Sequence, residues 1–229
     1  MMKFVDFLPY DKSIWLFPNG FCLVERTPSL RQQSFLYADG DILSVKAIEF
    51  FKLTPSDNPE VAVVVANEPP MLMPTELFDA KDAMKLISLQ YDAAKVEQTF
   101  DTEVDVYQMI YFLYKDEKSA LDRLGIRAHY LSYWSLAYHF VLQECASANL
   151  IWADEHNGYL DLLVQKNNKP MLFNRFKYVQ AEDELYFLMN VKQQFQLDDK
   201  TVVCFHSYLT RPSLKSLLTK YIDKYTIID

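Results

Sequence analysis

The chain has 229 residues, of which 50% are hydrophobic and 24% charged, a composition typical of a globular protein with room for one domain or two small lobes. Its net charge of −8, without a basic stripe, predicts that it binds no nucleic acid, because clustered Lys and Arg are needed to displace counterions. No apolar run reaches the roughly 18 residues needed to cross a bilayer, and the first residues do not resemble a signal peptide. We therefore expect no transmembrane segment.

The three cysteines, Cys22, Cys145 and Cys204, lie in apolar runs far apart in the sequence. Buried, reduced thiols are the simplest interpretation of such a pattern. The sequence therefore predicts a cytoplasmic protein.

The first part of the chain predicts a β-β-β-α-β-α series. Pro18-Asn19-Gly20 separates two β-prone runs, and Asn-Gly in that setting is a strong hairpin signal. An apolar stripe with helical spacing runs from Leu77 to Ala94. The expected strands are 13–17, 21–25, 33–37 and 61–66, and the expected helices are 42–51 and 77–94.

The polar stretch Lys95–Glu103 is a candidate junction. After it we expect a strand at 106–114, a short helix near 119–124, a strand at 127–131 and a helix at 134–145. A second β-β-β-α-β-α series then runs from Leu150 to Tyr225, with Tyr225 on the buried face of the last helix.

The two series keep similar spacing. Gly20 and Gly158 lie 138 residues apart, and Val61 and Thr201, each at the start of a fourth strand, lie 140 apart. This agreement predicts a duplicated α/β architecture with a first lobe at 1–100 and a second at 101–229, the latter carrying a connecting insertion at 104–131. A single α/β layer fold with chance similarity is the alternative.

Four stretches of the C-terminal part carry a resemblance to a known family: Met171–Tyr178, Glu182–Leu188, Leu217-Leu218 and Tyr221-Ile222, with a fainter match at Asn19-Gly20-Phe21. In these residues the chain resembles an uncharacterised bacterial family assigned the actin-like ATPase (ribonuclease H-like) fold, which is distantly similar to PilM and FtsA. The resemblance implies duplicated β-β-β-α-β-α units in two lobes with a nucleotide cleft between them.

In the superfamily, each hairpin turn carries an acid and a glycine that hold a hydrated metal and the phosphates. The resemblance would thus assign nucleotide binding to Asn19, Gly20, Asp154, Asn157 and Gly158. This chain departs from that pattern in three places. Pro18, which has no N–H, replaces the first acid. The resemblance matches Asp154 to the second acid, but the loop is longer and Gly158 lies late in it. His206-Ser207-Tyr208 replaces a Gly-Gly that admits adenosine.

These departures argue against ATP turnover, so we expect no ATP or magnesium cofactor and no catalytic residue. The four histidines lack metal-binding spacing, and no GxSxG, HExxH or Walker sequence occurs. Aromatic residues concentrate between the halves and predict either packing or an exposed docking patch: Tyr107, Tyr111, Phe112, Tyr114, Tyr130, Tyr133, Trp134 and Tyr138.

The sequence thus predicts a catalytically degenerate actin-like fold, a pseudoenzyme that acts as an interaction or scaffold module in the bacterial cytoplasm. Its partner would be an unidentified protein, and a homodimer is possible. The alternatives are an atypical ATPase or kinase that uses the cleft between the lobes, and a small-molecule sensor.

Overall fold

A computed structural model describes residues 8–37, 42–54, 58–156, 158–206, 212–222 and 225–228, with the main chain alone at 212–215 and 228. The chain divides into two compact units, Val5–Leu136 and Ala137–Asp229. The sequence placed the boundary between residues 100 and 101, which lie inside one strand. It also assigned residues 101–131 to the second lobe, whereas they belong to the first unit.

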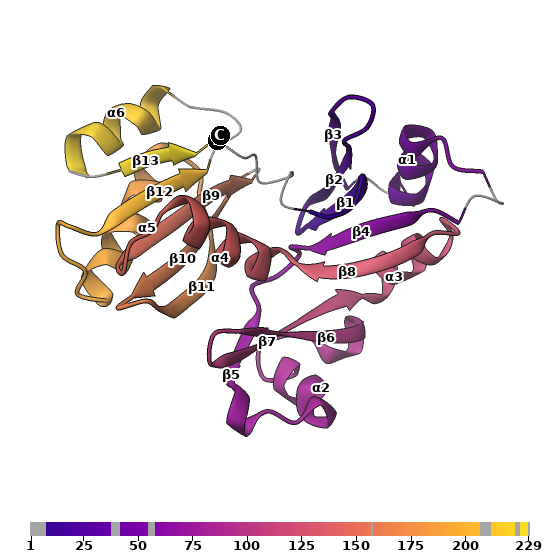
Figure 1. The fold of residues 1–229 in the computed structure, drawn as a ribbon, viewed down its shortest axis with the longest axis horizontal. Coiled ribbons are helices and arrows are strands. Elements are labelled where there is room, and N and C mark those ends of the chain that lie inside the picture. The colour runs from indigo at the N-terminus through magenta and orange to yellow at the C-terminus, as the bar shows by residue number, and fades with distance from the viewer. Residues whose placement is uncertain are drawn as a thin grey trace. The chain divides into compact units, whose positions relative to one another are not determined.

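The first unit is built on a five-stranded sheet with the order β3-β2-β1-β4-β8 (Figure 1). The first three strands are antiparallel, whereas β4 and β8 run parallel to β1. Side chains of α1 and α3 join one face of this sheet in an apolar core. The elements are β1 (Lys12–Phe17), β2 (Gly20–Glu25), β3 (Arg31–Leu36), α1 (Ile42–Phe51), β4 (Glu60–Val65), α3 (Lys115–Asp122) and β8 (Arg127–Ser132).

An insertion between β4 and α3 forms a smaller sheet with the order β5-β7-β6. The predicted helix at 77–94 is wrong, because this stretch holds 3-10 turns at Thr75–Leu77, Ala80–Asp82 and Ala93–Lys95 around one short helix, α2 (Ala83–Ile87). The predicted junction is also wrong, since Lys95–Glu103 lies largely in a strand whose exposed face is polar. The strands are β5 (Met71–Pro74), β6 (Val96–Val104) and β7 (Tyr107–Tyr114).

The second unit repeats the plan of the first. Its sheet has the order β11-β10-β9-β12-β13, again with three antiparallel strands followed by two parallel ones (Figure 1). The elements are β9 (Leu150–His156), β10 (Tyr159–Lys166), β11 (Lys169–Lys177), α5 (Ala181–Gln194), β12 (Val202–His206), α6 (Pro212–Tyr221) and β13 (Tyr225–Ile228). The predicted duplication of β-β-β-α-β-α units is therefore confirmed. Tyr225 begins a strand that the sequence had assigned to the last helix.

The second sheet has two different faces. Ile151, Ala153 and Leu162 lie on one face in a core shared with α5 and α6. Helix α4 (Tyr133–Glu144) contacts the other face, where Tyr138 meets Phe173 with ring centroids 6.0 Å apart. None of the described helices is both long and apolar enough to span a bilayer.

Candidate functional site

The first hairpin turn is shaped by its neighbour strand. A Cβ on Gly20 would lie 2.1 Å from the carbonyl oxygen of Phe35, so only glycine allows β3 to approach β2 here. The amide of Tyr37 donates to the carbonyl of Asn19 at 2.9 Å. Strand packing therefore accounts for Gly20 and for the main-chain carbonyl of Asn19, and Pro18 has no N–H to offer a phosphate.

The second turn leads to a row of buried charges across four strands. Cross-strand register places Arg175 beside Asp161, Asp161 beside Asp154, and Asp154 beside His206. Arg175 donates to both carboxylate oxygens of Asp161, from Nε at 2.5 Å and from Nη2 at 2.7 Å. His206 Nδ1 lies 2.9 Å from Asp154 Oδ1. We call these residues, together with His156, the charge row.

His156 bridges the two carboxylates of the charge row. Its Nε2 lies 2.8 Å from Asp161 Oδ2 and 3.6 Å from Asp154 Oδ2. Burial by itself would lower the pKa of His156, but the facing carboxylates of Asp154 and Asp161 outweigh it and raise the pKa. The two anions thus favour the protonated form of the imidazole.

The charge row is closed to solvent. The exposed side-chain fraction is 0% for Asp161, 1% for Asp154 and His206, 4% for Arg175 and 9% for His156. Two carboxylates and one guanidinium leave one negative charge, which a single protonated imidazole neutralises. The row is therefore a self-compensating ion-pair network, which is how proteins tolerate charge in their interior.

The remaining predicted site residues do not join this network. Gly158 has a φ of +88° and its carbonyl accepts from the amide of Tyr178 at 3.0 Å, which explains a glycine at this turn. The hydroxyl of Tyr178 donates to Glu155. Asn157 lies outside the described residues, as do Ser207 and Tyr208.

The residues present do not fit a hydrated magnesium nucleotide. Asp154, which the resemblance matched to the metal-holding acid, is buried and bound by His206 rather than open to a hydrated ion. His206, the first residue of the stretch that replaces the Gly-Gly, packs near the rings of Phe140 and Trp152. Within the described ranges, no group of three or more His, Cys, Asp or Glu side chains is arranged to hold a metal ion.

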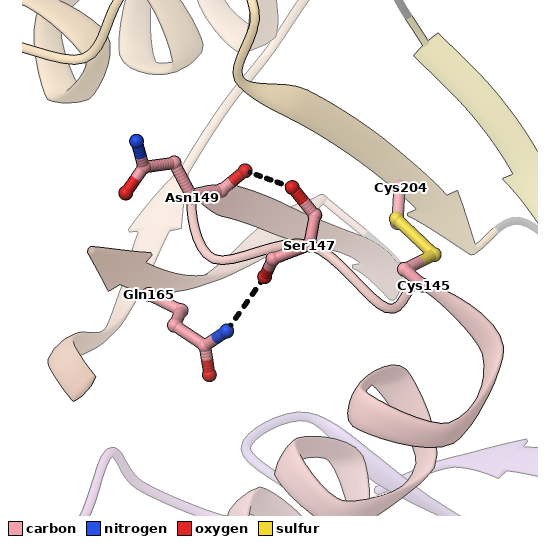
Figure 2. The surroundings of a disulfide bond; sticks show 5 residues. All are labelled: Cys145, Ser147, Asn149, Gln165 and Cys204. Atoms are coloured by element: carbon pink, nitrogen blue, oxygen red, sulfur yellow. Dashed lines mark hydrogen bonds between the residues drawn. A yellow bond between two sulfur atoms is a disulfide. The ribbon is translucent and has the colours of Figure 1, made fainter. Parts of the chain in front are cut away.

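Cys145 and Cys204 form a disulfide that joins the chain just after α4 to β12 (Figure 2). The predicted reduced state of these two thiols is therefore wrong, because residues 59 apart in sequence come together where the end of α4 meets the sheet. Nearby, Gln165 Nε2 donates to the carbonyl of Ser147 at 2.8 Å (Figure 2). Cys22 is free and buried. The disulfide removes the argument on which the cytoplasmic expectation rested.

The first unit holds a pocket of about 280 Å³ beside a buried carboxyl group. Burial raises the pKa of Glu117 to about 7, although hydrogen bonds from the Tyr114 amide and the Asn67 side chain oppose the rise. The residues that line the pocket are Tyr37, Ile42, Leu43, Asp116, Glu117, Ser119, Ala120 and Arg123.

Sequence reasoning missed Asp161 and Arg175. A signal was present, because Asp161 stands alone in the apolar run Tyr159–Val164, and a lone acid in a buried strand needs a partner. The eight clustered aromatic residues are all buried or half-buried, so they form no exposed docking patch.

Comparison with solved structures defines the class of protein. A protein from Bacteroides thetaiotaomicron VPI-5482 with an actin-like ATPase fold and unknown function matches with a TM-score of 0.72 and 20% identity, covering 100% of this chain and 94% of that one. The type IV pilus biogenesis complex PilM-PilN matches with a TM-score of 0.61 and 13% identity, covering 95% and 88%. The fold is therefore the actin-like ATPase fold with two mixed sheets, as the sequence predicted.

The ethanolamine utilization protein EutJ from Carboxydothermus hydrogenoformans gives a TM-score of 0.50 at 10% identity, covering 96% of this chain and 85% of that one. Residues 51–225 match the family model "Protein of unknown function (DUF3822)", and the chain belongs to this family. No curated protein matches the chain.

Proposed function

We propose that this chain is a catalytically degenerate actin-like module that works by binding another protein. The observation that carries the proposal is the state of Asp154. Its carboxylate is buried, bonded to His206 and close to His156, so a hydrated cation would have to displace both imidazoles from a closed network. Pro18 adds to this, because the first turn lacks an amide where a phosphate would need one.

The choice of a protein partner rests on the likeness to PilM, which was solved in a complex with PilN. At 13% identity this likeness supports the fold and makes a binding role reasonable by analogy, since one fold can host many functions. The proposal extends the analogy only to the kind of partner, a protein.

A measurement of nucleotide binding and hydrolysis tests whether the chain is catalytically degenerate. Equilibrium dialysis with Mg-ATP at millimolar concentration should show no saturable binding, and phosphate release should match the buffer blank. Asp154→Asn is the matched variant, because it keeps the shape of the side chain and removes the charge. Saturable binding by the unaltered chain that Asp154→Asn abolishes would establish the alternative, an atypical ATPase or kinase.

Crosslinking in the native host tests the interaction role. A stoichiometric protein partner that survives purification supports the proposal, whereas a chain recovered free of any other protein at its native abundance contradicts it.

One observation favours a second function, a small-molecule sensor. The first-unit pocket places the Glu117 carboxyl, with its raised pKa, beside apolar side chains and Arg123. Glu117→Gln keeps the acceptor oxygen and removes the titration. A ligand detected by protein NMR whose affinity changes in this variant would support the sensor.

A further inference from the structure

Strand β3 forms an open edge of the first sheet. Among the described strands it pairs only with β2. The amide of Tyr37 bonds the carbonyl of Asn19 on the β2 side, and antiparallel pairing alternates from residue to residue. The main-chain groups of Gln32, Ser34 and Leu36 therefore point away from β2, toward the open edge.

Three of the other edge strands, β8, β5 and β13, are either covered by side chains or short. At β8, the hydroxyl of Tyr111 donates to the carbonyl of Tyr130 at 3.3 Å, and the ring of Phe100 lies 4.7 Å from that of Tyr130. β5 and β13 have 4 residues each, and β5 ends in Pro74. Short strands and proline are common protections against unwanted strand pairing.

The two remaining edges carry charges of one sign. β6 exposes Glu97, Asp101 and Glu103, and β11 has Lys169 and Lys177 at its ends. A second copy that approached either edge would meet like charges, which protects the edge against self-association.

β3 has none of these protections. Its 6 residues are exposed except for the half-buried Phe35, and Leu36 leaves 60% of its surface in solvent. Arg31 is its single charged residue; it lies at the start of the strand and pairs at 2.6 Å with Glu25 of the same copy, which also binds Lys12 at 2.9 Å. The segment Gln32–Leu36 carries no charge, so two antiparallel β3 strands can meet along it with their Arg31 side chains at opposite ends, although the whole chain carries −8.

We propose that two copies of this chain pair through β3, antiparallel and two-fold symmetric about Ser34, so that the first sheets of the two copies join. Ser34 then lies opposite Ser34 of the second copy, and Gln32 lies opposite its Leu36. The outward amides and carbonyls of both strands are satisfied, and the exposed Leu36 side chains are covered by the stems of the glutamines. A self-complementary patch of this kind is what a two-fold dimer requires.

Charge placed at the centre of the strand provides the test. Sedimentation velocity at tens of micromolar should show a dimer. Ser34→Glu and Ser34→Lys should each weaken it at least about tenfold, because like charges then face each other across the two-fold axis. Mixing the two variants should restore a dimer that contains one of each.

Thr226→Glu is the matched control, since it adds the same charge to an exposed position on β13, the edge strand of the second sheet. It should leave the dimer unchanged. Unaltered circular dichroism of all three variants shows that the fold is intact. A chain that stays monomeric at this concentration overturns the proposal, and so does a dimer that Ser34→Glu does not weaken.

Hydrogen exchange provides an independent readout. In the dimer the amides of Gln32, Ser34 and Leu36 should be protected, and in the Ser34→Glu monomer they should exchange freely. The amides of Gln33 and Phe35, which face β2, should be protected in both. Fast exchange of all outward amides in a dimer would place the interface elsewhere and refute the pairing through β3.

Discussion

Two arginines on corresponding edge strands show how differently the two sheets use charge. Arg31 on β3 contacts Glu25 of β2, with 42% of its side chain exposed, and it stacks on the ring of Phe50. Arg175 on β11 contacts Asp161 of β10, with 4% exposed. In the first pair the arginine is exposed although Glu25 is buried, whereas the second pair is the closed end of the charge row. Corresponding edge strands of a duplicated fold therefore use an arginine ion pair in different ways.

The two sheets also differ in the side chains on the face that is turned away from α1 in the first unit and from α5 in the second. The face of the first sheet that is turned away from α1 carries Trp15, Cys22 and Val64 in neighbouring register positions, without charge. The corresponding turn of the second unit leads to Asp154, Asp161 and two histidines. The loss of an open acid at the second turn is thus tied to a network that now stabilises the second sheet.

The largest expected effect is the loss of the buried arginine. Arg175→Ala should lower the free energy of unfolding by about 3–5 kcal/mol, because Asp161 keeps a buried charge without its guanidinium partner. Arg31→Ala should cost less, about 1 kcal/mol, since water screens the exposed arginine and Lys12 remains paired with Glu25. Urea denaturation, with hydrogen exchange to separate the two sheets, measures both losses.

The double variant Asp161→Leu with Arg175→Met removes both charges together and should recover much of the lost stability, because apolar side chains often replace a buried ion pair without cost. If Arg175→Ala and Arg31→Ala lowered the free energy of unfolding equally, burial of the arginine would not explain the expected difference between the two ion pairs.

The two hairpin glycines should respond unequally. Gly20→Ala should cost about 1–3 kcal/mol, because its Cβ would overlap the Phe35 carbonyl and push β3 from the sheet. Gly158→Ala should cost about 1 kcal/mol, since its nearest contact, the carbonyl oxygen of Tyr178, is 3.8 Å away and only the positive φ is strained. Thermal unfolding of both variants checks the order, and a larger loss for Gly158→Ala would contradict the account of Gly20.

The smallest effect concerns pH, and the two units should respond in different ranges. The raised pKa of His156 favours folding while the imidazole is protonated, so stability of the second unit should fall as pH rises above about 6.5. Asp154, Asp161 and Arg175 are the charged groups that face it. The pKa of Glu117 is raised from 4.5 to about 7, so the first unit binds the extra proton when folded and loses stability as pH rises through that range.

Urea midpoints between pH 4 and pH 9 measure how the stability of each unit falls with rising pH. His156→Gln should remove the fall above pH 6.5 and leave the fall between pH 4.5 and pH 7, whereas Glu117→Gln should do the reverse. Slopes that persist in both variants would assign the pH dependence to other groups.

Several features were readable from residues alone. Asn19-Gly20 between two β-prone runs predicted the first hairpin, which the register of β1 and β2 confirms. The apolar run Val61–Ala66 predicted a strand, which is β4, between β1 and β8 in its sheet. By contrast, the helical spacing from Leu77 to Ala94 was misleading, because Leu77 and Leu89 are exposed in the insertion rather than packed along one helix face.

The duplication and the missing acid at the first turn can be read from residues alone, because turn chemistry and hydrophobic period are local properties of the chain. The buried ion-pair network around Asp154, the meeting of Cys145 with Cys204 and the open edge of β3 emerge only from the three-dimensional arrangement. These features depend on which strands become neighbours, and residues far apart in sequence acquire their charge partners and their exposure only when the sheets form.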